Sequence, residues 1–97
     1  MEKKEGNDNV IFIGSKPFMN YVTSVLMQFT TKNQEEIIVK ARGKWISRAV
    51  DVVEVVRKKF LKDNNLKITN VLIDSSEIEN TEGKKMSVSS IEITLSK

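Results

Sequence analysis

The alternation of apolar and polar residues predicts two strands and a helix in the first part of the chain. The unbroken apolar stretch Val10–Ile13 is typical of a strand covered on both faces. From Phe18 to Phe29 the apolar side chains recur at helical spacing, and Pro17 suits the first turn because its missing amide needs no partner there. The short run Ile37–Val39 has the length of a second buried strand.

The region after this second strand could in principle be a strand or a helix. The valines between residues 50 and 56 are β-branched, and their propensity alone would allow a strand. The pattern nevertheless runs from about Trp45 to Phe60 without a turn residue, and its apolar positions recur with helical spacing, so we predict a helix. Val52, Val55 and Val56 widen its apolar surface, which suggests a second buried contact, with another copy of the chain as a candidate.

Two further strands complete the predicted fold. Leu66–Ser76 and Val88–Leu95 have strand patterns, with Ile91 and Ile93 facing inward, and Glu77–Met86 is expected to form a long hairpin loop between them. The order is therefore βαβαββ. Strands separated by helices imply parallel pairing, and the final hairpin adds an antiparallel pair. We expect an α/β fold in which two helices cover one face of a four-stranded mixed sheet.

Length and composition limit what such a chain can do. Its 97 residues suit one domain, expected over residues 10–97, after a charged and polar arm at residues 1–9 that we expect to be disordered. No stretch is apolar enough to span a bilayer and no signal peptide opens the chain, so we expect an intracellular, soluble protein. The absence of His and Cys, and of any convergent carboxylate pair, argues against an enzyme and against a metal site or cofactor.

The strongest candidate site lies between the second strand and the second helix. Lys40, Arg42, Gly43, Lys44 and Arg48 surround this junction, and the net charge of +3 permits an anionic partner. Glycine allows a tight turn, and the open amides at the start of a helix attract anions. A phosphate is the simplest ligand, and several in a row suggest a nucleic-acid backbone. The alternative is a solvated basic surface with a glycine that serves only the turn.

Two other basic positions extend this candidate site. Lys16 stands at the start of the first helix, and right-handed crossovers would bring the two helix starts to the same edge of the sheet. Lys84 and Lys85 lie in the predicted hairpin loop, which could reach out as an arm toward a ligand. The alternative for this pair is an ordinary solvated loop tip.

Three segments resemble the Alba family of archaeal chromatin proteins. They are IGSKPFMNYV from Ile13, KARGKWISRAVDVVEVVRKKF from Lys40 and VSSIEI from Val88. The resemblance implies the fold of the C-terminal domain of translation initiation factor three. It also implies a cytoplasmic, chromosome-associated homodimer that binds double-stranded DNA with little sequence preference, binds RNA and has no enzymatic activity.

Carried over by position, the resemblance assigns nucleic-acid contacts to the basic residues already singled out and a contact between dimers to Phe60. The hairpin arms would follow the minor groove. Ser15 and Trp45 depart from the family pattern. Many members have a lysine at position 15 that can be acetylated, so this control does not carry over. Position 45 is usually small, and Trp45 could either stack on a base or sugar or pack on a neighbouring loop.

The sequence leaves the main ligand open. The first hypothesis is a dimeric chromatin protein that coats duplex DNA and assembles further along it. The alternative is a protein that mainly binds RNA, as an RNA chaperone or a ribonucleoprotein subunit. Phosphate contacts serve both polymers, so these residues do not separate the two.

Overall fold

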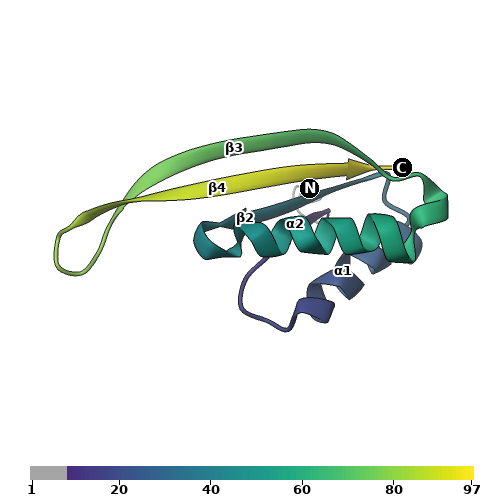
Figure 1. Cartoon of the computed structure of the whole chain (residues 1–97), viewed down its shortest axis with the longest axis horizontal. Coiled ribbons are helices and arrows are strands. Elements are labelled where there is room, and N and C mark those ends of the chain that lie inside the picture. Colours follow the sequence, from purple (N-terminus) through teal and green to yellow (C-terminus); the bar gives the residue numbers. More distant parts are fainter. Residues whose placement is uncertain (1–8) are drawn as a thin grey trace, which may run out of the picture.

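The computed structural model describes residues 9–97, which form one four-stranded sheet with two helices packed on one of its faces (Figure 1). The strand order is β1-β2-β4-β3. Short 3-10 turns at Gly43–Trp45 and Lys62–Asn64 and a π-helical turn at Val56–Phe60 flank the second helix. The main elements are β1 (Val10–Phe12), α1 (Phe18–Thr30), β2 (Glu36–Arg42), α2 (Ile46–Val55), β3 (Lys67–Glu79) and β4 (Lys85–Ser96).

The predicted element order and sheet type are confirmed. β1 and β2 are joined through α1 and pair in parallel, with Val10 opposite Ile38. β4 pairs antiparallel with both β2 and β3, so the hairpin joins the sheet through its second strand. The helix predicted between Trp45 and Phe60 is also confirmed, although its last turn is π-helical.

The hydrophobic core lies between the sheet and the helices. The helical stripe on α1 and the inward positions of β4 are buried as predicted, because each presents one apolar face to the other layer. The core is completed by β2 and α2. Its buried side chains include Tyr21, Val22, Val25, Phe29, Ile37, Val39, Ala49, Val52, Val53, Val56, Ile91, Ile93 and Leu95.

The wide apolar surface of the second helix is used within the chain itself. Val52 and Val56 have no exposed surface, and Val55 is half-buried against the same core. Val52 is covered because α2 contacts both the sheet and α1, and Val56 is covered because the π-helical turn that it begins also contacts α1. The expectation that these valines form a contact with another copy is therefore wrong for Val52 and Val56.

The two N-terminal strands also differ from the prediction. β1 is an edge strand whose outer face is open, so Phe12 keeps 70% of its surface exposed and the prediction of a strand covered on both faces is wrong. β2 continues to Arg42, so Lys40 and Arg42 belong to the strand rather than to the junction after it. The turn itself begins at Gly43, because the ladder with β4 persists through the pair Arg42 and Ser90.

The hairpin has longer strands and a shorter loop than predicted. β3 extends to Glu79 and β4 begins at Lys85, because alternating residues such as Ile78 and Met86 pair across the ladder. In the remaining loop, the Oδ1 atom of Asn80 accepts hydrogen bonds from the amides of Glu82 and Lys84, each at 2.9 Å. The hairpin extends beyond the helices, along the 48 Å longest dimension of the molecule (Figure 1).

The expected N-terminal arm lies almost entirely outside the described residues. The side chain of its last residue, Asn9, donates a hydrogen bond to the carbonyl oxygen of Glu36, and the backbone carbonyl oxygen of Asn9 accepts one from the amide of Ile38. Among residues 9–97, no helix is long and apolar enough to cross a membrane.

Candidate nucleic-acid interface

The two connections from strand to helix lie side by side, and Arg48 joins them. From the first turn of α2, its Nη1 atom donates hydrogen bonds to the carbonyl oxygens of Gly14 and Lys16, at 3.0 and 2.5 Å. Both acceptors belong to the connection between β1 and α1. The structure therefore places Lys16 at the same end of the sheet as Arg42 and Lys44. We call these three exposed cations the basic patch.

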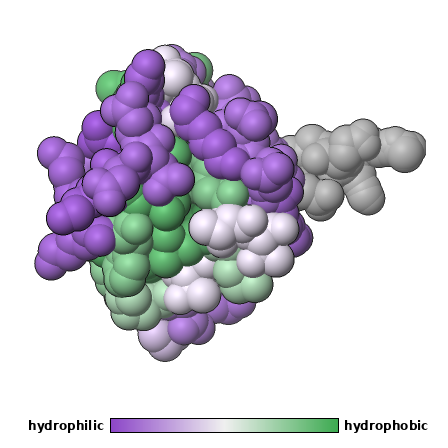
Figure 2. Space-filling model, turned by 90° about the vertical axis from the view of Figure 1, so that its right-hand side faces the viewer, coloured by the Kyte–Doolittle hydropathy of each residue, from purple (hydrophilic) through white to green (hydrophobic). Residues whose placement is uncertain are grey.

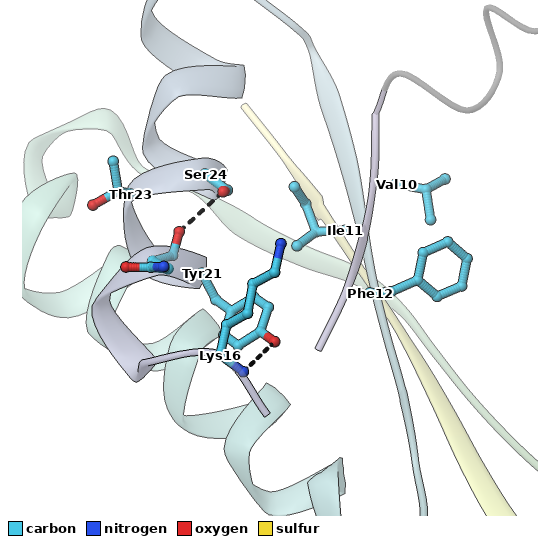
Figure 3. A pocket seen from close by; sticks show the side chains of 8 residues that line it. Val10, Ile11, Phe12, Lys16, Tyr21, Thr23 and Ser24 are labelled. Carbon is cyan, nitrogen blue, oxygen red and sulfur yellow. Dashed lines mark hydrogen bonds between the residues drawn. The ribbon is translucent and has the colours of Figure 1, made fainter. Parts of the chain in front are cut away.

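The hydroxyl group of Tyr21 fixes the connection that carries Lys16. It accepts a hydrogen bond from the amide of Gly14 at 2.9 Å and another from the amide of Lys16 at 3.0 Å. The second of these is drawn in Figure 3. These two amides are thereby satisfied, so the exposed Lys16 side chain is the positive group that this connection offers to an anion. The sequence indicated only a core role for Tyr21, because helical spacing reveals which face is buried but not where a hydroxyl points.

Lys16 borders a shallow pocket of about 470 Å³ between β1 and α1. Its side chain lies alongside Ile11, and Asn20, Thr23 and Ser24 supply polar groups from the helix (Figure 3). Ile11 faces this side of β1, whereas Phe12 points to the opposite side. The pocket is therefore a polar groove with one cation at its edge, suited to the backbone of a polyanion.

The connection between β2 and α2 depends on Gly43. Its φ angle of +61° lies in the left-handed region, which side chains other than glycine rarely adopt. The following 3-10 turn and α2 have no acidic residue in their first turns and no side-chain cap. The positive end of the helix dipole and the exposed cations Arg42 and Lys44 therefore all attract an anion to this connection.

Trp45 packs against the domain rather than projecting from it. It is half-buried against the hydrophobic core. The Nζ atom of Lys44 lies 5.0 Å and the Cζ atom of Arg48 lies 5.5 Å from the centre of its ring. Of the two alternatives for this residue, the geometry favours packing. Arg48 is likewise directed inward by the indole and by its two carbonyl acceptors, which makes it a brace within the site.

Lys40 lies on the open face of the sheet, away from the helices. Its Nζ atom is 3.6 Å from an Oε2 oxygen of Glu92, which stands opposite Lys40 on β4. The same Nζ atom lies 5.7 Å from the centre of the Phe12 ring. Because the carboxylate of Glu92 already offsets its charge, Lys40 attracts a phosphate less strongly than Arg42 does.

Lys84 and Lys85 are exposed near the tip of the hairpin, apart from the basic patch. Ser90 of β4 pairs with Arg42, the last residue of β2, so the residues before Ser90 carry the hairpin past the end of that strand. The arm therefore projects from the end of the sheet at which the basic patch lies (Figure 1). One chain thus offers a compact group of cations and a separate basic arm.

Phe60 lies in the π-helical turn that follows α2, at the opposite end of this helix from the basic patch. Half of its surface is exposed. An apolar area framed by hydrophilic residues is visible at this end of the molecule (Figure 2). Phe60 therefore lies exposed and apart from the basic patch.

The chain is thus a small two-layer domain with cations gathered at one end and a basic hairpin that projects from that end. The family model described as Alba matches residues 9–75, and the chain belongs to the Alba family. DNA/RNA-binding protein Alba of Methanococcus maripaludis is 48% identical over 93% of this chain and 99% of its own length. The protein of the same name from Methanocella arvoryzae is 50% identical over 91% of this chain and 88% of its own. The structure of Alba from Thermoplasma volcanium superposes with a TM-score of 0.81, at 48% identity, covering 92% of this chain and all of that one.

Proposed function

We propose that this protein is a dimeric chromatin protein that binds double-stranded DNA through its phosphates with little sequence preference, and that it also binds RNA. The observation that carries the proposal is the placement of Lys16 beside Arg42 and Lys44 through the hydrogen bonds of Arg48. The names of its relatives, which describe DNA- and RNA-binding proteins, support it. The proposed role is binding without catalysis, in the cytoplasm and on the chromosome.

The character of the basic patch supports recognition of the backbone rather than of base sequence. Lys16, Arg42 and Lys44 are exposed cations on one end of the domain. Such side chains contact phosphate oxygens, which are the same in every sequence. Binding then gains free energy mainly from the release of counterions, so its affinity falls steeply as salt is added.

The hairpin supports the proposal of a homodimer. Every residue of β3 is exposed in the single chain, although the strand carries several large apolar side chains. Val71 keeps 53%, Leu72 48% and Ile73 76% of its surface exposed. Contiguous apolar surface and a long free edge strand are both costly to leave in water. A second copy of the chain would cover them and bring two basic patches and two arms to one duplex.

Assembly beyond the dimer is proposed through Phe60. Its exposed ring and the apolar area visible in Figure 2 lie away from the basic patch, so a contact there leaves the phosphate-binding cations available. Dimers bound side by side on a duplex would then stabilise one another.

The alternative function is binding mainly to RNA, and the exposed ring of Phe12 favours it, because aromatic side chains stack on unpaired bases. Crosslinking in cells, followed by sequencing of both the bound DNA and the bound RNA, tests the two functions. Broad coverage of the chromosome supports the DNA proposal. Recovery of RNA without DNA supports the alternative, and recovery of neither contradicts both.

A further inference from the structure

Phe12 is an exposed aromatic residue on the open face of the sheet. It keeps 70% of its surface exposed, because β1 is an edge strand and the helices cover only the other face. Its side chain points to the opposite side of β1 from Lys16 (Figure 3). The hydrophobic core does not account for it, because Phe12 does not belong to that core.

Beside Phe12 lies a second pocket, of about 450 Å³, at the place where the short strand β1 ends next to the longer strand β2. Phe12, Trp45 and Ile91 supply apolar wall. The charged groups of the lining belong to Lys40, Arg42 and Glu92. The volume falls within the range of about 300–1,000 Å³ usual for small-molecule sites, so the pocket can admit a nucleobase.

The charges around this pocket favour a phosphate at its edge and a neutral base in its interior. Arg42 belongs to the basic patch and also lines the pocket, so a phosphate bound there lies at its edge. The carboxylate of Glu92 lines the same pocket and lies 3.6 Å from the Nζ atom of Lys40, so this pair adds no net charge that would hold a phosphate in the interior. A neutral base with N–H groups on its edge suits both Glu92 and the ring of Phe12.

We propose that this pocket binds an unpaired nucleobase, stacked on Phe12 and walled by Trp45, in a single strand whose phosphates lie on the basic patch. The inference rests on the proposed function, because the same cations hold the strand. A base within a duplex cannot enter, since its faces are stacked and its edge is paired. The shared ligand chemistry is an unpaired base, which either RNA or single-stranded DNA supplies.

Trp45 provides a direct reporter, because it is the only tryptophan among the 97 residues. The intact protein is titrated with a short single-stranded RNA, the single-stranded DNA of the same sequence, and the corresponding DNA duplex. Both tryptophan fluorescence and affinity are measured. We expect the single strands to change the fluorescence of Trp45 more than the duplex does, because only an unpaired base would enter the pocket that the indole lines.

The variants Phe12→Leu and Phe12→Tyr form a matched pair. Leucine keeps an apolar side chain without a stacking face, and tyrosine keeps the ring. Because stacking of one base contributes about fivefold or more to affinity, Phe12→Leu should weaken single-strand binding by about that factor. Phe12→Tyr should bind single strands like the unaltered protein, and both variants should bind duplex DNA unchanged.

The outcomes distinguish this inference from the proposed function. Dependence on Phe12 with either single strand supports the base site and identifies the polymer that fills it. If duplex binding depends on salt but Phe12→Leu binds single strands as tightly as the unaltered protein, the base site alone is overturned. An equal loss for duplex and single strand also overturns it, because Phe12 would then contact the backbone. If the protein binds none of the three ligands, both proposals are overturned.

Discussion

The Nη1 atom of Arg48 lies 3.0 Å from the carbonyl oxygen of Gly14, which it reaches across 34 positions of the chain. This hydrogen bond holds the start of α2 against the connection that carries Lys16. The cations of the basic patch are therefore held together by a further cation, Arg48, which is itself turned inward. Arg48 and Lys44 are consequently expected to differ in what they contribute, although both lie at the start of α2.

Replacing Arg48 should lower the free energy of unfolding. Arg48→Ala removes charge-assisted hydrogen bonds to Gly14 and Lys16 that are partly open to solvent, so we expect a loss of about 1–2 kcal/mol in the free energy of unfolding. Lys44→Ala should change it by less than about 0.5 kcal/mol, because Lys44 is exposed. Urea titration of both variants measures the difference, and equal stabilities would show that Arg48 is no brace.

The cations of the basic patch should act through salt-dependent binding. Lys16→Ala removes two phosphate contacts from a dimer, so the slope of log affinity against log salt should become shallower by about two. Arg42→Ala should do the same, and neither loss should depend on the duplex sequence. Lys32→Ala is the matched control, because this exposed lysine follows the far end of α1. A slope as steep as that of the unaltered protein, measured on two unrelated duplexes, would mean that the backbone binds elsewhere.

The hairpin lysines should contribute to duplex binding without contributing to folding. The double variant Lys84→Ala, Lys85→Ala should make the salt slope shallower by up to about four in a dimer. Its thermal midpoint should stay unchanged, because both side chains are exposed. Binding isotherms at several salt concentrations test this expectation, and an unaltered slope would favour the alternative of a solvated loop tip.

A charge placed on the open part of β3 should separate the proposed dimer into folded monomers. Ile73 is 76% exposed in the single chain, so Ile73→Glu should leave the fold intact but prevent burial against a second copy. Sedimentation equilibrium at micromolar concentration should show about twice 11.1 kDa for the unaltered protein and 11.1 kDa for the variant. Met27→Glu, at an exposed position on α1, is the control and should stay dimeric. An unaltered protein that sediments only as a monomer contradicts the dimer.

Phe60 should matter more for assembly on DNA than for folding. Because half of its surface is exposed, Phe60→Ala should cost about 1 kcal/mol, well below the 3–5 kcal/mol typical of a fully buried phenylalanine. Cooperative coating of long duplexes should weaken, while binding to a duplex that holds a single dimer stays the same. A large loss of stability together with unchanged coating would place Phe60 in the core of the chain instead.

The sequence by itself determined the order of elements and most of the core. The stripe from Tyr21 to Phe29 and the alternation of Ile91 and Ile93 are local periodicities, so they reveal which face of each element is buried whatever the partner is. The basic residues at the two helix starts were also readable, because a strand, a short turn and a helix in succession fix where each connection lies.

Only the tertiary structure decided what covers each apolar face and where each polar group points. Val52 and Val56 are buried by α1 and the sheet of their own chain, whereas Phe12 is left open by its place on the edge strand. The inward direction of Arg48 and the hydroxyl of Tyr21 depend on acceptors and donors in another segment. A sequence pattern indicates that a face is apolar or that a side chain is charged. The residues that contact this face or side chain come from distant parts of the chain, and they are fixed only when the helices and strands pack together.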